Sequence, residues 1–205
     1  MNVDYTLYLA TDRTILGARS LEAAVEEAVR NGVTVVQLRE KACASGEFYE
    51  IGRRLLAVTR RCGVPLIIND RLDILLALDA DGLHVGRGDL PLGRARALTP
   101  GKILGYSVHS VADLRHAEAC GADYVGIGPA VPTGTKPDAA AALGVAGVAE
   151  IARAASIPCV AIGGIHAGNA AAVQAAGVSG VCVISAILGA AEIDKAARGL
   201  RAALG

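Results

Sequence analysis

The sequence predicts a single α/β domain folded as a closed (β/α)₈ barrel. Short apolar runs rich in β-branched residues alternate with stretches whose apolar residues recur at helical spacing. The apolar runs contain no polar alternation, which is typical of parallel strands buried on both faces. Eight strand–helix units within 205 residues fit a slightly compact barrel.

The expected elements cover the whole chain, residues 1–205, without a linker or domain boundary. Glycines at 32, 121 and 177 each stand between a helix and a strand, where a left-handed residue ends the helix. A doubly wound sheet is the weaker alternative, because no G-x-G-x-x-G follows the first strand. We expect strands at 5–11, 33–40, 65–70, 82–86, 103–108, 123–129, 158–163 and 180–185. We expect helices near 20–31, 46–62, 71–78, 110–120, 145–155, 167–176 and 190–203, with only a short turn near 92–98.

Composition and charge exclude several classes of protein. Twenty basic and twenty acidic residues balance, and only 3% of residues are aromatic, so neither a basic stripe nor a stacking platform for nucleic acid is expected. Although 53% of residues are hydrophobic, no apolar run is long enough to cross a membrane, and the first residues do not resemble a signal peptide. We therefore expect a cytoplasmic protein whose five scattered cysteines are reduced.

Two aspartates follow neighbouring strands of the predicted barrel. Asp70 ends the strand LIIND, and Asp89 lies in the loop after GLHVG. Carboxyl ends of adjacent parallel strands meet, so both carboxylates should converge, and Mg²⁺ is usually held by one or two carboxylates with water and substrate phosphates. The alternative for Asp89 is a helix cap before Leu-Pro-Leu. The pair together favours a Mg²⁺ site.

The second strand ends in the segment Gln37-Leu38-Arg39-Glu40-Lys41. Because side chains alternate between faces of a strand, Gln37, Arg39 and Lys41 should share the face that points into the barrel mouth, while Leu38 and Glu40 share the other. Barrel-facing positions are ordinarily apolar, so two cations and an amide there favour anion binding over a solvated strand end.

The later strand ends carry further polar groups. Ser107 can face the mouth, whereas Ser110 is expected to cap a helix and His109 to make a structural hydrogen bond. The loop that contains Thr133, Gly134, Thr135 and Lys136 offers donors to an anion, although a surface loop is equally compatible with it. Gly164 stands at the end of strand seven, and Ile184 with Ser185 end strand eight just before a helix, where such barrels often hold phosphate.

The remaining histidines, His84, His116 and His166, lack metal-ligand spacing, and no Ser/His/Asp or Cys/His set is evident. The sequence therefore offers anion and metal binding without a nucleophile.

The motifs together resemble the thiamine-phosphate synthase (thiamine-phosphate pyrophosphorylase) family. The resemblance runs through YLATD, VVQLREK, LIINDRLDI, ADGLHVGRGDLP, GYSVHS, GADYVGIGPAVPTGTK, IPCVAIGGI and GVCVISAI, nearly the whole length. Single pieces are weak signals, but QLREK, NDR, the D-L-P loop and P-T-x-T-K in this order are specific. The family's fold is a (β/α)₈ barrel.

The resemblance implies an enzyme that joins 4-amino-5-hydroxymethyl-2-methylpyrimidine diphosphate to 4-methyl-5-(2-phosphoethyl)thiazole, forming thiamine monophosphate and pyrophosphate. Mg²⁺ is the implied cofactor, on Asp70 and Asp89. The residues implied for the pyrimidine diphosphate are Gln37, Leu38, Arg39, Glu40, Lys41, Asn69, Ser107 and Lys136, and those implied for the thiazole phosphate are Thr133, Gly134, Thr135, Gly164, Ile184 and Ser185. Lys136, Ser107, Arg39 and Lys41 are the catalytic candidates, since the thiazole nitrogen needs no general base and the leaving diphosphate needs its charge neutralised.

Two alternatives stay open. A thiazole tautomerase shares the fold and the thiazole phosphate site, and Val108 also occurs in that group, but tautomerases tend to lack the paired aspartates and the QLREK lysine. A phosphate-binding regulator without turnover needs a broken metal site, which the sequence does not show. Small-molecule substrates are the expected partners, without nucleic acid or membrane, and oligomeric state is left open, with a homo-oligomer as one option.

Overall fold

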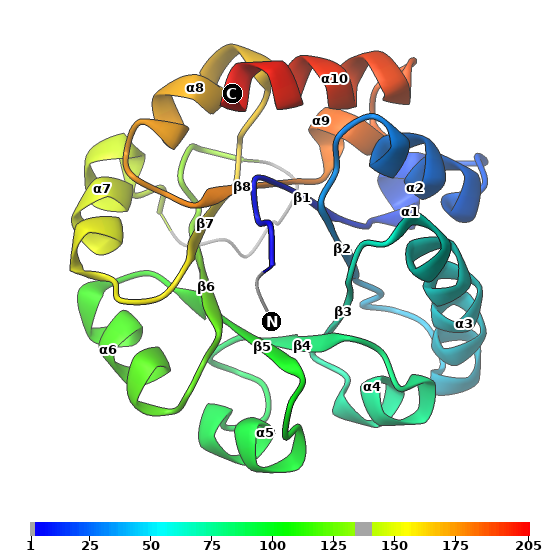
Figure 1. Ribbon diagram of the computed structural model, residues 1–205, viewed down its shortest axis with the longest axis horizontal. Coiled ribbons are helices and arrows are strands. Elements are labelled where there is room, and N and C mark those ends of the chain that lie inside the picture. The colour runs from blue at the N-terminus through cyan, green and yellow to red at the C-terminus, as the bar shows by residue number, and fades with distance from the viewer. Residues whose placement is uncertain (1–2, 134–140) are drawn as a thin grey trace.

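A closed ring of parallel strands forms the centre of the computed structural model, which describes residues 3–133 and 141–205 (Figure 1). Each strand pairs with the next along the chain, and the last pairs with the first. The predicted (β/α)₈ fold is therefore confirmed. Within the described residues the strands are β1 (Leu7–Ala10), β2 (Val35–Leu38), β3 (Leu66–Asn69), β4 (Gly82–Val85), β5 (Ile103–Val108), β6 (Tyr124–Ile127), β7 (Cys159–Ile162) and β8 (Gly180–Val183).

The helices surround this ring, and α10 lies beside α8 and α2 (Figure 1). Those found in the described part of the chain are α1 (Arg13–Leu16), α2 (Leu21–Arg30), α3 (Ser45–Cys62), α4 (Leu72–Leu78), α5 (Leu92–Leu98), α6 (Val111–Ala119), α7 (Gly144–Ala154), α8 (Ala167–Gln174), α9 (Ser185–Leu188) and α10 (Ile193–Leu204).

The helix ends follow the predicted local chemistry. The Ser110 hydroxyl accepts a hydrogen bond from the Asp113 amide at 3.1 Å and caps α6, as expected. Gly32, Gly121 and Gly177 all have positive φ angles, which confirms their predicted role in ending helices. These turns lie at the amino ends of the strands, so the opposite end of the barrel is left for longer loops.

Side chains alternate between two buried layers along each strand. In β2, Val35 and Gln37 point into the barrel, whereas Val36 and Leu38 pack outward against the helices. The inner layer holds Tyr5, Tyr8, Ala10, Val35, Ile67, Ile103, Tyr124, Val160 and Cys182. The inner positions near the carboxyl ends are instead polar, which is the first structural indication of where a ligand binds.

Three local expectations were wrong or incomplete. Residues 92–98 form the helix α5 instead of a short turn, because Leu92 and Ala95, three residues apart, bury one face against the barrel. The short helices α1 and α9 were not predicted, and Ser185 begins α9 where the last strand was expected to end. Except for β5, which spans the expected residues 103–108, each strand is shorter than expected, because residues at the expected strand ends belong to the adjoining loops.

The structure also describes the state of the cysteines and the hydropathy of the helices. All five cysteines are unpaired, as predicted. Among helices in residues 3–133 and 141–205, none is long and apolar enough to cross a bilayer.

Candidate active site

Most of the predicted site residues lie at the carboxyl ends of the strands. Gln37 is in β2, Asn69 ends β3, and Ser107 is the next-to-last residue of β5. Asp70 follows β3 directly, Asp89 lies in the loop after β4, and Gly164 lies just after β7. The barrel therefore brings groups that are up to 127 residues apart, Gln37 and Gly164, to one end of the molecule.

Asp70 and Asp89 converge as the sequence predicted. Their carboxyl groups lie within hydrogen-bonding reach of each other, and Asp70 is only partly exposed. Burial and the neighbouring Asp89 carboxylate raise the pKa of Asp70 to about 6. Two carboxylates that repel each other in this way are a suitable donor set for a divalent cation, because hard oxygen ligands are what Mg²⁺ prefers.

The backbone holds both carboxylates in place. Asp70 has a φ of 62°, a left-handed conformation that aspartate tolerates better than most residues, and its amide donates to the His84 carbonyl at 2.8 Å. The Asp89 carboxylate accepts a hydrogen bond from the Gly86 amide at 2.7 Å. Asp89 thus folds back onto its own loop, and the N-cap position of α5 is occupied by Pro91, so Asp89 is not that helix's cap.

Two cations follow β2, and one of them, Lys41, lies beside the acidic pair. The Lys41 ammonium lies 3.9 Å from an Asp70 oxygen and its side chain is half exposed. The Arg39 guanidinium lies 3.7 Å from Asp12, and the Arg39 amide donates to the buried Thr11 hydroxyl at 3.1 Å. Both cations are held loosely enough by carboxylates to meet an incoming anion.

Leu38 and Glu40 lie on the other face of this segment. The Leu38 side chain is fully buried in the outer core. The Glu40 carboxylate pairs with Arg13 at 3.0 Å and is only 8% exposed. Any contact that these two residues make with a ligand in the mouth must therefore come from their backbone, and the charge of Glu40 is already balanced.

A continuous series of hydrogen bonds runs through the barrel interior below the mouth. Gln37 Nε2 donates to the Tyr8 hydroxyl at 2.8 Å, and Tyr8 is 2.8 Å from the Tyr124 hydroxyl. Tyr124 in turn lies 2.9 Å from His84 Nδ1, and His84 Nε2 lies 2.9 Å from Ser107 Oγ. Burial lowers the pKa of His84 to about 4 and raises the pKa values of both tyrosines, so all three are neutral.

His84, Tyr8 and Tyr124 were not predicted as part of the site. The sequence does contain a signal for His84, because it shares the inward face of β4 with Gly82, two residues before it. A polar residue and a glycine on the same inward face of a strand indicate that a large side chain from another strand occupies the space beside the glycine. His109, by contrast, contacts the Gly128 carbonyl at 3.0 Å, the structural role expected for it.

The ends of β6, β7 and β8 form the other half of the mouth. Gly164 has a φ of 65°, and a Cβ atom there would lie 2.6 Å from the Pro132 carbonyl and 2.8 Å from the Val131 carbonyl. The loop after β6 therefore packs directly on this glycine. Ile184 and Ser185 begin α9 after β8, and Thr133 is the last described residue of the β6 loop. The predicted residues Gly134, Thr135 and Lys136 lie outside the described residues.

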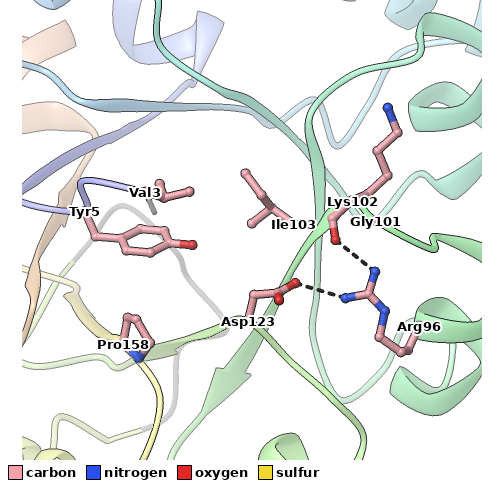
Figure 2. Close-up of a pocket in the computed structure, with 8 residues that line it drawn as sticks. All are labelled: Val3, Tyr5, Arg96, Gly101, Lys102, Ile103, Asp123 and Pro158. Carbon is pink, nitrogen blue, oxygen red and sulfur yellow. Dashed lines mark hydrogen bonds and ion pairs between the residues drawn. The ribbon is translucent and has the colours of Figure 1, made fainter. Parts of the chain in front are cut away.

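A hollow of about 440 Å³ lies at the opposite, amino-terminal end of the barrel (Figure 2). Its charged groups are paired, since Arg96 bonds Asp123 at 2.9 Å and donates to the Lys102 carbonyl at 2.8 Å. Figure 2 shows the Tyr5 hydroxyl pointing into this hollow. In barrels of this type that end contributes to stability and the carboxyl end to catalysis, so the hollow is not the candidate site.

Comparison with known sequences finds relatives that are described as thiamine-phosphate synthases. The family model described as thiamine monophosphate synthase matches residues 7–187. The "Thiamine-phosphate synthase" of Desulfitobacterium hafniense (strain Y51) is 52% identical over 201 residues, which cover 98% of this chain and 97% of the relative. The protein of the same name from Chloroflexus aurantiacus is 48% identical over 200 residues, 98% of this chain and 93% of the relative.

Solved structures agree with these sequence matches. A thiamine phosphate pyrophosphorylase from Pyrococcus furiosus superposes with a TM-score of 0.90 at 38% identity, covering 98% of this chain and 96% of that chain. A 3-hexulose-6-phosphate synthase gives a TM-score of 0.68 at 21% identity, covering 98% and 100%, and this likeness shows the fold alone.

Proposed function

The chain belongs to the thiamine-phosphate synthase family, and from this premise we propose how its residues carry out the synthesis of thiamine monophosphate. The protein is a transferase that forms thiamine monophosphate and releases pyrophosphate. The proposed substrates are the pyrimidine diphosphate and the thiazole phosphate named above. The thiazole ring nitrogen attacks the methylene carbon of the pyrimidine. The bond between this carbon and the diphosphate oxygen breaks, and pyrophosphate leaves.

The proposed residues for the pyrimidine diphosphate lie at the ends of β2, β3 and β5. In this proposal Gln37, Asn69 and Ser107 offer amide and hydroxyl groups, while Arg39 and Lys41 offer positive charge. Holding both substrates in line converts a bimolecular reaction into an effectively unimolecular one. The cations stabilise the charge that develops on the leaving diphosphate.

Asp70 and Asp89 fit the Mg²⁺ ion that the family resemblance implies. Their carboxyl groups are in mutual reach, and burial together with the neighbouring Asp89 carboxylate raises the pKa of Asp70, so a bound cation would stabilise the ionised pair. No group of three or more possible ligands occurs in the described ranges, 3–133 and 141–205, and two carboxylates plus substrate phosphate oxygens are the donor set that Mg²⁺ commonly uses. When bound, the ion supplies Lewis-acid stabilisation of the diphosphate worth several kcal/mol.

The thiazole phosphate is assigned to the opposite half of the mouth. Gly164 lets backbone approach closely, and Ile184 with Ser185 offer amide and hydroxyl donors at the start of α9. Thr133, Gly134 and Thr135 complete the proposed set, with Lys136 reaching the diphosphate. This division separates the two anionic groups and leaves the reacting atoms between them.

The observation that carries this proposal is the convergence of Asp70 and Asp89 with Lys41 beside them. The test is pyrophosphate release from both substrates with and without Mg²⁺. Wild type should release pyrophosphate and form thiamine monophosphate only with the divalent ion, and Asp70→Asn and Asp89→Asn should lose activity. Asp73→Asn is the matched control, because Asp73 is exposed and pairs with Arg71 outside the mouth.

If Asp70→Asn and Asp89→Asn both keep wild-type activity, the metal assignment is wrong. Isomerisation of the thiazole carboxylate phosphate, without use of the pyrimidine diphosphate, would instead support the tautomerase alternative. Cytoplasmic location and a homo-oligomeric state stay predictions.

A further inference from the structure

The buried hydrogen bonds described above connect two of the proposed substrate-binding residues. Gln37 on β2 and Ser107 on β5 lie at the two ends of the series, with Tyr8, Tyr124 and His84 between them. All three intermediate side chains are at least 91% buried, so they do not themselves reach a ligand in the mouth. Ser107, in contrast, is exposed there.

One direction along this series gives every buried hydrogen an acceptor. Gln37 donates to the Tyr8 oxygen, so the Tyr8 hydrogen is available for Tyr124. The Tyr124 hydrogen is then available for His84 Nδ1, which in this direction acts as the acceptor. A neutral imidazole has one N–H and one lone pair, so the proton lies on Nε2 and is donated to Ser107 Oγ.

In this direction the Ser107 oxygen accepts from His84, so the hydroxyl hydrogen can be donated to a group in the mouth, where Ser107 is exposed. An acceptor in the mouth, such as an oxygen of the diphosphate, would meet a donor that is already oriented. Preorganised donors of this kind stabilise developing negative charge without reorganising during the reaction.

Packing fixes the orientation of the Tyr124 and His84 rings. A Cβ atom at Gly105 would overlap the Tyr124 ring and lie 2.5 Å from His84 Nδ1, and one at Gly126 would lie 3.3 Å from the His84 ring. Strands β5 and β6 therefore have glycine at the positions that face these rings. The Tyr5 ring supports Tyr124 from below, with centroids 4.8 Å apart. The rings cannot turn without displacing strand backbone or neighbouring side chains.

We propose that Tyr8, Tyr124 and His84 are positioning residues that orient the Ser107 hydroxyl as a hydrogen-bond donor to the pyrimidine diphosphate. The proposal rests on the function proposed above, which places Ser107 against that substrate. The three residues act through Ser107, so their contribution to kcat/KM must disappear when the Ser107 hydroxyl is removed.

A double-mutant cycle tests this dependence. Tyr124→Phe in the otherwise native protein should lower kcat/KM about tenfold, the effect of one neutral hydrogen bond. In a Ser107→Ala background the same change should lower it less than about twofold, because the group it orients is gone. Tyr8→Phe should show the same pattern. An equal loss in both backgrounds would overturn the proposal, since it would mean that the tyrosines act only on packing.

Tyr5→Phe is the matched control. It removes a hydroxyl from the same barrel interior, but this hydroxyl points to the amino-terminal hollow (Figure 2) and not into the series. It should change kcat/KM by less than about twofold in both backgrounds. A Tyr5→Phe loss as large as that of Tyr124→Phe would also count against the proposal.

A measurement without substrate separates this proposal from the proposed function. Long-range ¹H–¹⁵N correlation spectra of the histidine rings report which nitrogen carries the proton, and the His84 signals are those lost in His84→Gln. We expect the Nε2–H tautomer in wild type, and the Nδ1–H tautomer would refute the inferred direction. Absence of thiamine monophosphate with the Nε2–H tautomer present would contradict the function and leave the hydrogen-bond direction supported.

Discussion

Replacing Asp70 by Asn should stabilise the metal-free protein while removing its response to Mg²⁺. The variant keeps the shape of the side chain and tolerates the left-handed backbone at this position, where φ is 62°. It removes one of two carboxylates that lie within reach of each other. The site is thus a place where charge that is needed for binding lowers folding stability.

The magnitude follows from the pKa of Asp70. A folded-state pKa of about 6, against 3.8 for an unperturbed aspartate, means that the carboxyl binds its proton more tightly in the folded protein. Its contribution to stability is complete below pH 3.8 and is lost as the pH rises through 6. The difference corresponds to at most about 3 kcal/mol above pH 6, and to about 1–2 kcal/mol after screening by solvent at a side chain that is 28% exposed.

Thermal unfolding in EDTA measures this effect. At pH 8 the Asp70→Asn variant should unfold about 2–8 °C above wild type. At pH 5 the gain should be about half as large, because Asp70 in the folded wild type is then mostly protonated. Added Mg²⁺ should raise the wild-type midpoint and leave the variant unchanged. Asp73→Asn, the exposed control, should stay within about 0.5 kcal/mol of wild type.

A variant that is equally stable or less stable than wild type at pH 8 in EDTA would refute this reasoning. The same midpoint gain at pH 5 and pH 8 would also contradict it, since the gain would then come from something other than the charge of Asp70.

Three further predictions concern the metal, the proposed role of Lys136 and the packing of the inner rings. Mg²⁺ affinity measured by calorimetry should fall about tenfold per pH unit below pH 6, because a proton competes for Asp70; constant affinity between pH 7 and pH 5 would contradict this. Lys136→Ala should lower kcat about 10²–10³-fold if this lysine stabilises the leaving diphosphate, and an unchanged rate would exclude that role. Gly105→Ala should lower the free energy of unfolding by about 1–3 kcal/mol in denaturant titration, because its Cβ meets the His84 and Tyr124 rings, whereas Gly199→Ala on the open side of α10 should not destabilise the protein.

The barrel could be predicted from the sequence because its signals are local. Apolar runs without polar alternation mark strands that are buried on both faces, and the glycines at 32, 121 and 177 mark the turns between helix and strand. Residues 92–98 were mispredicted because a seven-residue helix provides only two buried contacts, Leu92 and Ala95, too few for a clear period. Short helices depend on tertiary packing more than on their own pattern.

The outer part of the candidate site could also be predicted, because strand ends in a parallel barrel converge by geometry. Asp70 and Asp89 are the clearest case. The inner hydrogen bonds could not be predicted this way. Contacts such as Tyr8 with Tyr124, 116 residues apart, depend on how rings fill a closed interior, and no spacing in the sequence encodes that distance. The partner of Glu40 is similar, since Arg13 comes from a short helix that was not predicted.

The most direct test of this account is a crystal structure with pyrophosphate and Mn²⁺, whose anomalous signal locates the ion. The account predicts one ion bound by oxygens of both Asp70 and Asp89, directly or through one shared water, with pyrophosphate oxygens completing its shell and Lys41 beside them. An ion that binds pyrophosphate without either aspartate would contradict the central claim that these two strand ends hold the metal of the reaction.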